Sequence, residues 1–501
     1  MSQVSATPPP YLIDLVRNSE KVVPRDRAWV LTMAGPKLHA WPMATPHFSS
    51  SDEIFEYLLG YVNVEKGQAT VFKLDRMQDL AEKLGNPHLG RLTIHVAGSK
   101  GKGSVSTMCA NILSAAGLKV GLYTSPHLLR WKERISFPDK EISEEVLISA
   151  MEEILPLVEG KTAKDFPGDE MPTYFELTTL VAFCAFRALG CDVQVIETGL
   201  GGRLDSTNIV DPDVSVITPI ELEHTQFLGD TIAKIAFEKA GIMKPRKPVC
   251  VSRQKEEALS VFEAKATETG GHLFRLGVDI DAVDVQVDAG GTSCGLVRVS
   301  ASECALAAIL PSGRLDVACP MIGAIQAQNM ALAAMAAACA LSAIKAAAIV
   351  EGLARSRLPA RFELASSEPA IVLDGAHTPE SIRLTLDTMR TLFPGPKVLL
   401  FACAYDKRHA EMAKILAPHF DAITVTKPGN FKVSDPESVF GSFAALRLDA
   451  TLEEDTRAAI VRSIAEAGRR NAALLVTGSF YLCSEAKSFL KEAKEGSAPP
   501  R

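Results

Sequence analysis

Three runs of apolar residues end abruptly in polar or glycine-rich sequence. These runs lie at the start of the segments 92–108, 191–208 and 213–245. The polar groups that follow them are Lys102, Glu197, and Glu223 with His224. Short apolar runs bounded by turn residues predict buried strands, and ligands bind beyond the carboxyl ends of the strands in an open parallel sheet. The pattern therefore predicts one site assembled from three distant segments.

Strand and helix patterns alternate over most of the chain. They predict an α/β domain with a mainly parallel sheet from residue 52 to 361, and an inserted β-structure at 272–320, where Val and Asp alternate. The Ala-rich residues 331–354 predict a closely packed helical run. Residues 362–501 predict a smaller Rossmann-like α/β domain. Its strand candidates are residues 371–377, 398–408, 421–428 and 473–482. Residues 1–51, which contain Pro-Pro-Pro, predict an extension.

Composition narrows the class of protein without identifying it. The chain has 501 residues and a net charge of −7, which argues against a general nucleic-acid binder. Its ten cysteines form no C-x-x-C pair, so they indicate core thiols in a reducing compartment. Neither a membrane-spanning apolar run nor a signal core is found. We expect a cytoplasmic monomer that binds neither nucleic acid nor membrane.

The segment after the first apolar run favours phosphate binding. Gly101 and Gly103 flank Lys102, and Ser104 follows. Backbone N–H groups of a glycine turn and of a helix start can surround phosphate, a lysine can neutralise it, and a hydroxyl can hold magnesium. The strict G-x-x-x-x-G-K-[ST] pattern fails, because Val96 replaces its first glycine and Gly103 separates Lys102 from Ser104. A solvated loop of the same composition is the alternative.

Six segments together resemble the folylpolyglutamate synthases and dihydrofolate synthases of the Mur ligase superfamily. They are HVAGSKGKGS, YTSPHL, ETGLGGRLDSTN, EHTQFLGDTIAKIAFEKAGI, LPARFE and LDGAHTPES, in the order of the family. The resemblance spans about residues 52 to 490. It implies a P-loop Mur-ligase-type ATPase domain followed by the smaller C-terminal domain, with ATP and Mg²⁺ as cofactors.

The resemblance also implies roles for individual residues. Nucleotide-binding positions are Gly101, Lys102, Gly103, Ser104, Asn329, Arg361 and Asp374. Magnesium-ligand positions are Ser104, Ser125, Glu197 and His224. Catalytic positions are Lys102, Lys239 and His377, and Lys239 matches the lysine that these enzymes carbamylate, which would turn a cation into an anionic oxygen ligand.

Three departures from the family pattern stand out. Residues 323–326 read Gly-Ala-Ile-Gln where the family often has Gly-x-His-Gln, so the resemblance implies the loss of a polar contact near the adenine. Glu223, not aspartate, precedes His224. Ala360 replaces the glycine of Pro-Gly-Arg and removes conformational freedom, but Arg361 keeps the cation.

The implied reaction is ATP-dependent addition of L-glutamate to reduced folate through an acyl phosphate, with a hinge near residues 358–366 closing the site. Dihydrofolate synthase, acting on dihydropteroate, or a bifunctional enzyme remains open, because the motifs are shared. A nucleotide-hydrolysing switch is a remote alternative, since it needs neither DGAHTPES nor a lysine fifteen residues beyond His224. A ligase for cell-wall precursors is weakened by the folate-type GKGS and GLGGRLD sequences.

Several other residues carry competing interpretations. His95, inside an apolar run, favours a hydrogen-bonded structural histidine. Residues 199–205 favour a loop that holds Glu197 over a dinucleotide turn. For His127, contact with the substrate and a purely structural role are equally supported. Tyr174 and Phe175 could border the substrate, but core packing is the commoner role of such aromatics.

Overall fold

The computed structural model describes residues 47–62, 72–299, 306–310, 312–429, 433–447 and 449–496. The predicted extension therefore lies outside the described residues up to position 46. The described chain forms two compact units, divided between Leu358 and Pro359. None of the helices in these ranges is long and apolar enough to cross a membrane.

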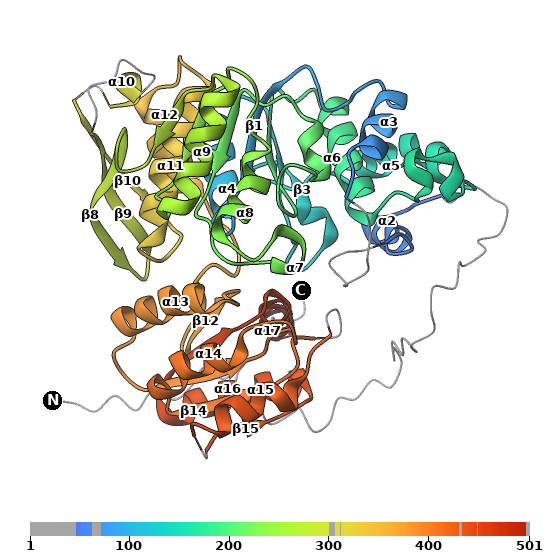
Figure 1. Cartoon of the computed structure of the whole chain (residues 1–501). Helices are drawn as coiled ribbons and strands as arrows, with labels where there is room; N and C mark the ends of the chain where they lie inside the picture. The colour runs from blue at the N-terminus through green and yellow to red at the C-terminus, as the bar shows by residue number, and fades with distance from the viewer. Residues whose placement is uncertain are drawn as a thin grey trace. The chain divides into compact units, whose positions relative to one another are not determined.

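A seven-stranded sheet organises the first unit (Figure 1). Its spatial order is β3-β2-β4-β1-β5-β6-β7, and all neighbours are parallel except β2 and β3. The strands are β1 (Leu92–Ala97), β2 (Val120–Tyr123), β3 (Ile135–Ser136), β4 (Val193–Glu197), β5 (Val214–Ile217), β6 (Val249–Val251) and β7 (Leu273–Arg275). The three predicted strands are thus adjacent as β4-β1-β5, so their carboxyl ends share one edge.

Helices cover both faces of this sheet. One face packs on α4 (Lys102–Ala115), α11 (Ile325–Ala340) and α12 (Ala346–Arg355). The other packs on two groups: α2 (Ser51–Leu58), α3 (Asp75–Lys83), α5 (Glu144–Val158) and α6 (Tyr174–Ala188), and then α8 (Ile232–Ala240) and α9 (Glu256–Thr269). Helix α4 is buried almost all round, from Gly103 to Leu113, which explains why its sequence lacks a polar face.

The Ala-rich run is helical and the insertion is β-structure, as predicted. The Ala-rich run, however, is divided between two helices. Residues 331–354 contribute to two helices, α11 and α12, because Leu341 takes an extended conformation between them. The insertion is a three-stranded antiparallel sheet, ordered β10-β9-β8. Its elements are β8 (Ile280–Asp288), β9 (Gly291–Arg298), α10 (Leu306–Ile309) and β10 (Arg314–Cys319).

The second unit is a six-stranded α/β sheet ordered β11-β12-β16-β13-β14-β15. The four predicted strands are β12 (Ala370–Asp374), β13 (Lys397–Phe401), β14 (Ala422–Val425) and β16 (Ala473–Thr477). The structure adds β11 (Glu363–Ser367), which is antiparallel, and the two-residue β15 (Thr451–Leu452). Its helices are α13 (Pro379–Leu392), α14 (His409–Leu416), α15 (Pro436–Ala444), α16 (Thr456–Arg470) and α17 (Phe480–Gly496).

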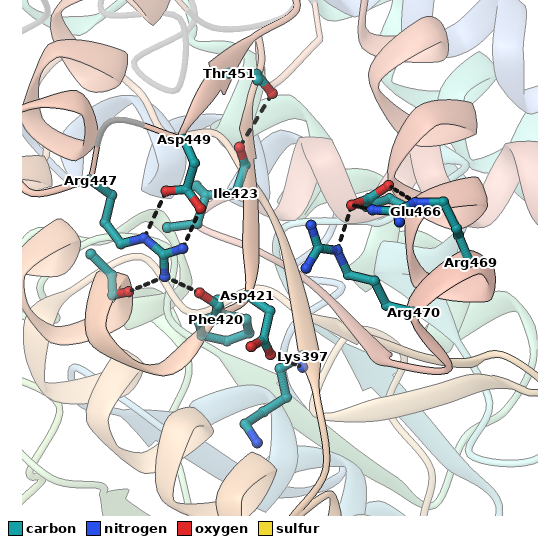
Figure 2. Close-up of polar contacts among 11 residues, drawn as sticks. Lys397, Phe420, Asp421, Ile423, Arg447, Asp449, Thr451, Glu466, Arg469 and Arg470 are labelled. Carbon is teal, nitrogen blue, oxygen red and sulfur yellow. Dashed lines mark hydrogen bonds and ion pairs between the residues drawn. The ribbon is translucent and has the colours of Figure 1, made fainter.

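Charged side chains stabilise the amino-terminal edge of this sheet (Figure 2). Arg447 forms a two-pronged ion pair with Asp449 and donates to the carbonyl oxygens of Ala417 and Phe420. Asp421 accepts the backbone N–H of Lys397 at 2.9 Å, joining the starts of β13 and β14. These contacts lie at the opposite end of the strands from Asp374, so we assign them to stability.

Candidate active site

A glycine turn joins β1 to α4 and defines the candidate phosphate loop. Gly98 has φ +145°, and a Cβ there would lie 1.8 Å from Thr218 Oγ1. Gly101, the N-cap of α4, has φ +85°, and a Cβ there would lie 2.9 Å from Asn329 Oδ1. Both positions therefore require glycine. The turn leaves the first N–H groups of a 14-residue helix without helical partners, as anion binding requires.

Asn329 reaches this turn from α11, far away in the sequence. It is 4% exposed, and its Nδ2 donates to Gln326 Oε1 at 2.9 Å. The hydrogen bond fixes the amide so that Oδ1 faces Gly101. Gln326 is the glutamine of the altered Gly-Ala-Ile-Gln sequence, so this chain uses that residue to orient Asn329.

Two lysines share one backbone oxygen beneath the turn. Lys102 Nζ donates to Gly98 O at 3.1 Å, and Lys239 Nζ donates to the same oxygen at 2.7 Å. Lys239 is 1% exposed and pairs with Glu223 Oε1 at 3.1 Å. The segments after β1 and β5 therefore meet α8 at one cluster of charge, as the three-strand pattern predicts.

The charges in this cluster change one another's protonation. Burial lowers the pKa of Lys239 to about 8, and Lys102 adds to this, while Glu223 opposes it. Burial by itself would raise the pKa of Glu223, but Lys239, Lys102 and Lys100 together hold it well below its usual range. Glu223 is therefore an anion, and a minor share of Lys239, about a tenth at pH 7, is a neutral amine.

Glu197 brings the third strand end into the same region. Its Oε2 accepts the backbone N–H of Ser125 at 3.1 Å, which ties the loop after β2 to the end of β4. A Cβ on Gly103 would lie 3.5 Å from the same oxygen, so the carboxylate lies against the first turn of α4, where Ser104 is buried. His224 follows Glu223 in the chain, occupies the N-cap position of α7 (Thr225–Leu228) without a side-chain capping bond, and is exposed.

These four predicted magnesium positions supply two hydroxyls, one carboxylate and one imidazole. In the described ranges, no three His, Cys, Asp or Glu side chains lie together as a metal cage. Mg²⁺ ordinarily keeps several waters and binds through one or two protein groups plus substrate phosphates. Glu197 and Ser104, which lie together at the first turn of α4, fit that mode of binding.

A buried chain of hydrogen bonds supports the loop behind Glu197. His95 Nε2 lies 2.8 Å from Thr207 Oγ1, which donates to Asp205, and Asp205 also accepts the N–H of Leu200 at 2.7 Å. This confirms a hydrogen-bonded structural histidine. It also shows that residues 199–205 form a loop held by its own aspartate. Sequence reasoning missed Asp205, although an acidic residue after a glycine turn was the available signal.

A buried arginine organises the neighbouring TSPH segment. Arg134, 1% exposed, donates from Nε to His127 Nδ1 at 2.8 Å, and its guanidinium lies 5.5 Å from the ring centre of Tyr174. His127 therefore carries its proton on Nε2 when neutral. Tyr174 is 1% exposed within α6, as core packing predicts. Nothing in the pattern of the sequence singles out Arg134.

The second unit carries Arg361, Asp374 and His377 at the carboxyl end of β12. Asp374 accepts from Phe362 N at 2.7 Å, Ala376 N at 2.8 Å and Thr385 Oγ1 at 3.1 Å. Burial raises its pKa, and these bonds and the charge of Arg361 offset this only in part. Its carboxylate thus holds the loop that presents Arg361.

Comparison with known proteins agrees with this architecture. The Mur ligase middle domain matches residues 96–338, and the Mur ligase glutamate ligase domain matches residues 360–480. A folylpolyglutamate synthase of Lacticaseibacillus casei is 33% identical over 425 residues, which cover 84% of this chain and 94% of that protein. The chain belongs to the folylpolyglutamate synthase and dihydrofolate synthase family of Mur ligases. Both matched domains are ligase domains, as expected for a ligase and not for a nucleotide switch.

Other members of the family differ in name and extent. A dihydrofolate synthase/folylpolyglutamate synthase of Bacillus subtilis is 30% identical over 435 residues, covering 83% of this chain and 95% of that protein. A probable bifunctional folylpolyglutamate synthase/dihydropteroate synthase of Haloferax volcanii is 35% identical over 420 residues, covering 83% of this chain. The chain spans only 48% of that longer protein.

Solved structures of the family share the fold. Mycobacterium tuberculosis folylpolyglutamate synthase complexed with ADP has a TM-score of 0.80 and 27% identity, covering 91% of this chain and all of that one. A folylpolyglutamate synthase in complex with AMPPCP and folate has a TM-score of 0.74 and 31% identity, covering 88% and 99%.

Proposed function

We propose that this chain is an ATP-dependent, ADP-forming ligase that adds L-glutamate to the γ-carboxyl group of a reduced folate. The observation that carries the proposal is the shared edge of β4, β1 and β5. There, a glycine turn at a helix start, two lysines on Gly98 O and the carboxylate of Glu197 come together. Relatives named folylpolyglutamate synthase support the choice of substrates.

The chemistry needs activation of a carboxylate, which is a poor electrophile. In the proposed reaction, the folate γ-carboxylate attacks the γ-phosphorus of ATP, and ADP leaves. The amine of glutamate attacks the resulting acyl phosphate, phosphate departs, and the amine loses a proton. Phosphoryl transfer asks the protein chiefly for positioning and for stabilisation of charge, so no nucleophilic serine or cysteine is required.

We assign the residues of the first unit as follows. The phosphates would be bound by Gly101, Lys102, Gly103 and Ser104. Asn329, which lies against Gly101, would also contact the nucleotide. Ser104, Ser125, Glu197 and His224 would hold magnesium, which when bound supplies positive charge at the phosphate oxygens. Lys239 would act as its carbamate; the lowered pKa of the amine supports this, because only a neutral amine reacts with CO₂.

The assignments in the second unit rest on the resemblance and on local geometry. Arg361 and Asp374 are proposed nucleotide-binding residues. Arg361 would contact the nucleotide, and Asp374 would hold the loop that carries Arg361. His377 donates from Nδ1 to Gly375 O at 2.8 Å, because a carbonyl can only accept. In the neutral ring, Nε2 is therefore the nitrogen without the proton.

Dihydrofolate synthesis is a second candidate activity. Relatives that carry both names, such as the one from B. subtilis, favour it, and the motifs of the chain fit both acceptors. A monomeric state and a cytoplasmic location remain predictions from the sequence.

One assay separates these activities. The protein is incubated with ATP, Mg²⁺ and labelled glutamate, with tetrahydrofolate and dihydropteroate offered separately. We expect tetrahydrofolate to gain one glutamate with equimolar ADP, and a gain by dihydropteroate would establish the second activity. ATP-dependent labelling of neither acceptor would overturn the proposal.

A further inference from the structure

Phe480, the first residue of α17, is the centre of a small cluster in the second unit. The guanidinium carbon of Arg361 lies 4.2 Å from the centre of its ring. His377 meets the same ring edge to face, with 6.1 Å between ring centres. A Cβ on Gly375 would lie 2.5 Å from Phe480 Cε1, so the ring packs directly on the backbone between Asp374 and Ala376.

The backbone that carries Arg361 is held in a costly conformation. Ala360 and Phe362, on either side of it, have φ values of 54° and 47°. Side chains with a Cβ adopt this left-handed conformation at a cost, so neighbouring contacts must hold it. Asp374 accepts from Phe362 N at 2.7 Å, Glu363 accepts from Ala360 N at 3.0 Å, and Lys487 pairs with Glu363.

These contacts hold the backbone of the loop, whereas the Phe480 ring contacts the Arg361 side chain itself. A guanidinium over an aromatic face is attracted to the ring and loses little hydration of its edge, where its N–H donors point. The ring therefore favours a stacked guanidinium, whose N–H donors lie in the stacking plane and not toward the ring.

We infer that Phe480 is a positioning residue that orients the Arg361 guanidinium for a phosphate of ATP. This inference rests on the proposed nucleotide role of Arg361 and adds the residue through which that role is achieved. The aromatic face is the essential property, and hydrophobic bulk alone does not replace it.

Three variants of the full-length protein test this. F480L removes the π face but keeps apolar bulk, and F480Y keeps the face. F489L is a matched control, because Phe489 lies on the same helix under another cation, Arg457, 5.0 Å from its ring centre. For F480L we expect the KM for ATP to rise about threefold to tenfold with a smaller change in kcat. F480Y and F489L should keep the wild-type KM for ATP, and combining F480L with R361K should be less than additive.

A spectroscopic measurement distinguishes failure of this inference from failure of the proposed function. In ¹⁵N-arginine-labelled protein, the Arg361 Nε–H resonance, assigned by its loss in R361K, should be shifted upfield by the ring and should move in F480L but not in F489L. Lack of ligation by the wild type would overturn the proposed activity, whereas this resonance still tests the stacking. A wild-type KM for ATP in F480L, or an equal rise in F489L, would overturn the positioning role. If F480L melts well below the wild type, Phe480→Met replaces it, with the same expectations.

Discussion

Lys239 Nζ lies 3.1 Å from Glu223 Oε1, and this buried ion pair ties α8 to the loop that follows β5. Glu223 spans the gap from this loop to the helix, and Lys239 is buried where the two meet. The pair opposes the effect of burial on the pKa of Lys239, and the balance places that pKa at about 8. Lys239 therefore exchanges between a protonated form that pairs with Glu223 and a neutral amine that can react with CO₂.

Replacing Lys239 by alanine should lower ligation about 10²-fold to 10³-fold, because a charged group next to the phosphate loop is lost. If the carbamate supplies only charge and metal coordination, millimolar acetate or formate should restore part of the rate. Lys234→Ala is the control, since Lys234 lies on the same helix but is exposed and pairs with Asp230. Absence of rescue at every carboxylate concentration would count against a coordinating carbamate.

Carbamate formation at Lys239 should increase as the pH rises through about 8, because CO₂ attacks only the neutral amine and that form gains population above the pKa. Glu223→Gln removes the charge that raises this pKa, so its onset should move to lower pH. The ¹³C carbamate signal of protein equilibrated with labelled bicarbonate measures both. A signal that Lys239→Ala leaves intact would place the carbamate elsewhere.

Removing Lys102 should reduce kcat/KM by about 10²-fold or more, since the lysine would no longer balance phosphate charge in the transition state. Lys83→Ala, at an exposed position paired with Asp79 on α3, should leave the rate unchanged. Steady-state ADP release with saturating folate and glutamate checks this. Turnover of Lys102→Ala at the wild-type rate would remove the loop from the reaction.

Much of the site could be predicted from sequence because it depends on local rules. Apolar runs that end in polar residues predicted the adjacent strands β4, β1 and β5, and the glycine turn with Lys102 predicted a helix start open to anions. The short strands β11 and β15 were not predictable, because a few residues at a sheet edge have no distinctive pattern. Some residues act through tertiary contacts, such as Arg134 against the ring of Tyr174 and Phe480 against the guanidinium of Arg361. The spacing of residues in the sequence does not reveal such contacts.

The substitution of alanine for glycine at position 360 illustrates another limit. The sequence indicates lost conformational freedom, yet Ala360 keeps a left-handed φ of 54°. Hydrogen bonds from Ala360 N to Glu363 and from Gly375 N to Ala360 O hold it there. Which backbone conformation survives a substitution depends on partners distant in sequence.

Glu197→Gln should raise the Mg²⁺ concentration needed for half-maximal turnover about tenfold, because an amide oxygen carries no net charge for a hard cation. The amide can still accept the N–H of Ser125, so the fold of that loop should persist and the melting temperature should stay close to the wild type. Turnover measured against Mg²⁺ at fixed ATP gives the shift. An unchanged midpoint would place the metal away from β4.

Gly101→Ala should separate a structural role of the loop from a binding role. Alanine at φ +85° costs about 1–2 kcal/mol of stability from backbone strain alone. Its Cβ would also lie 2.9 Å from Asn329 Oδ1 and displace that amide. Gly117→Ala, beyond the other end of α4 at φ +90° with open space around its Cβ, should lose similar stability without touching the site. Calorimetry with ADP should therefore show weakened binding only for Gly101→Ala. Equal loss of affinity in both variants would mean that stability, and not the geometry of the loop, controls binding.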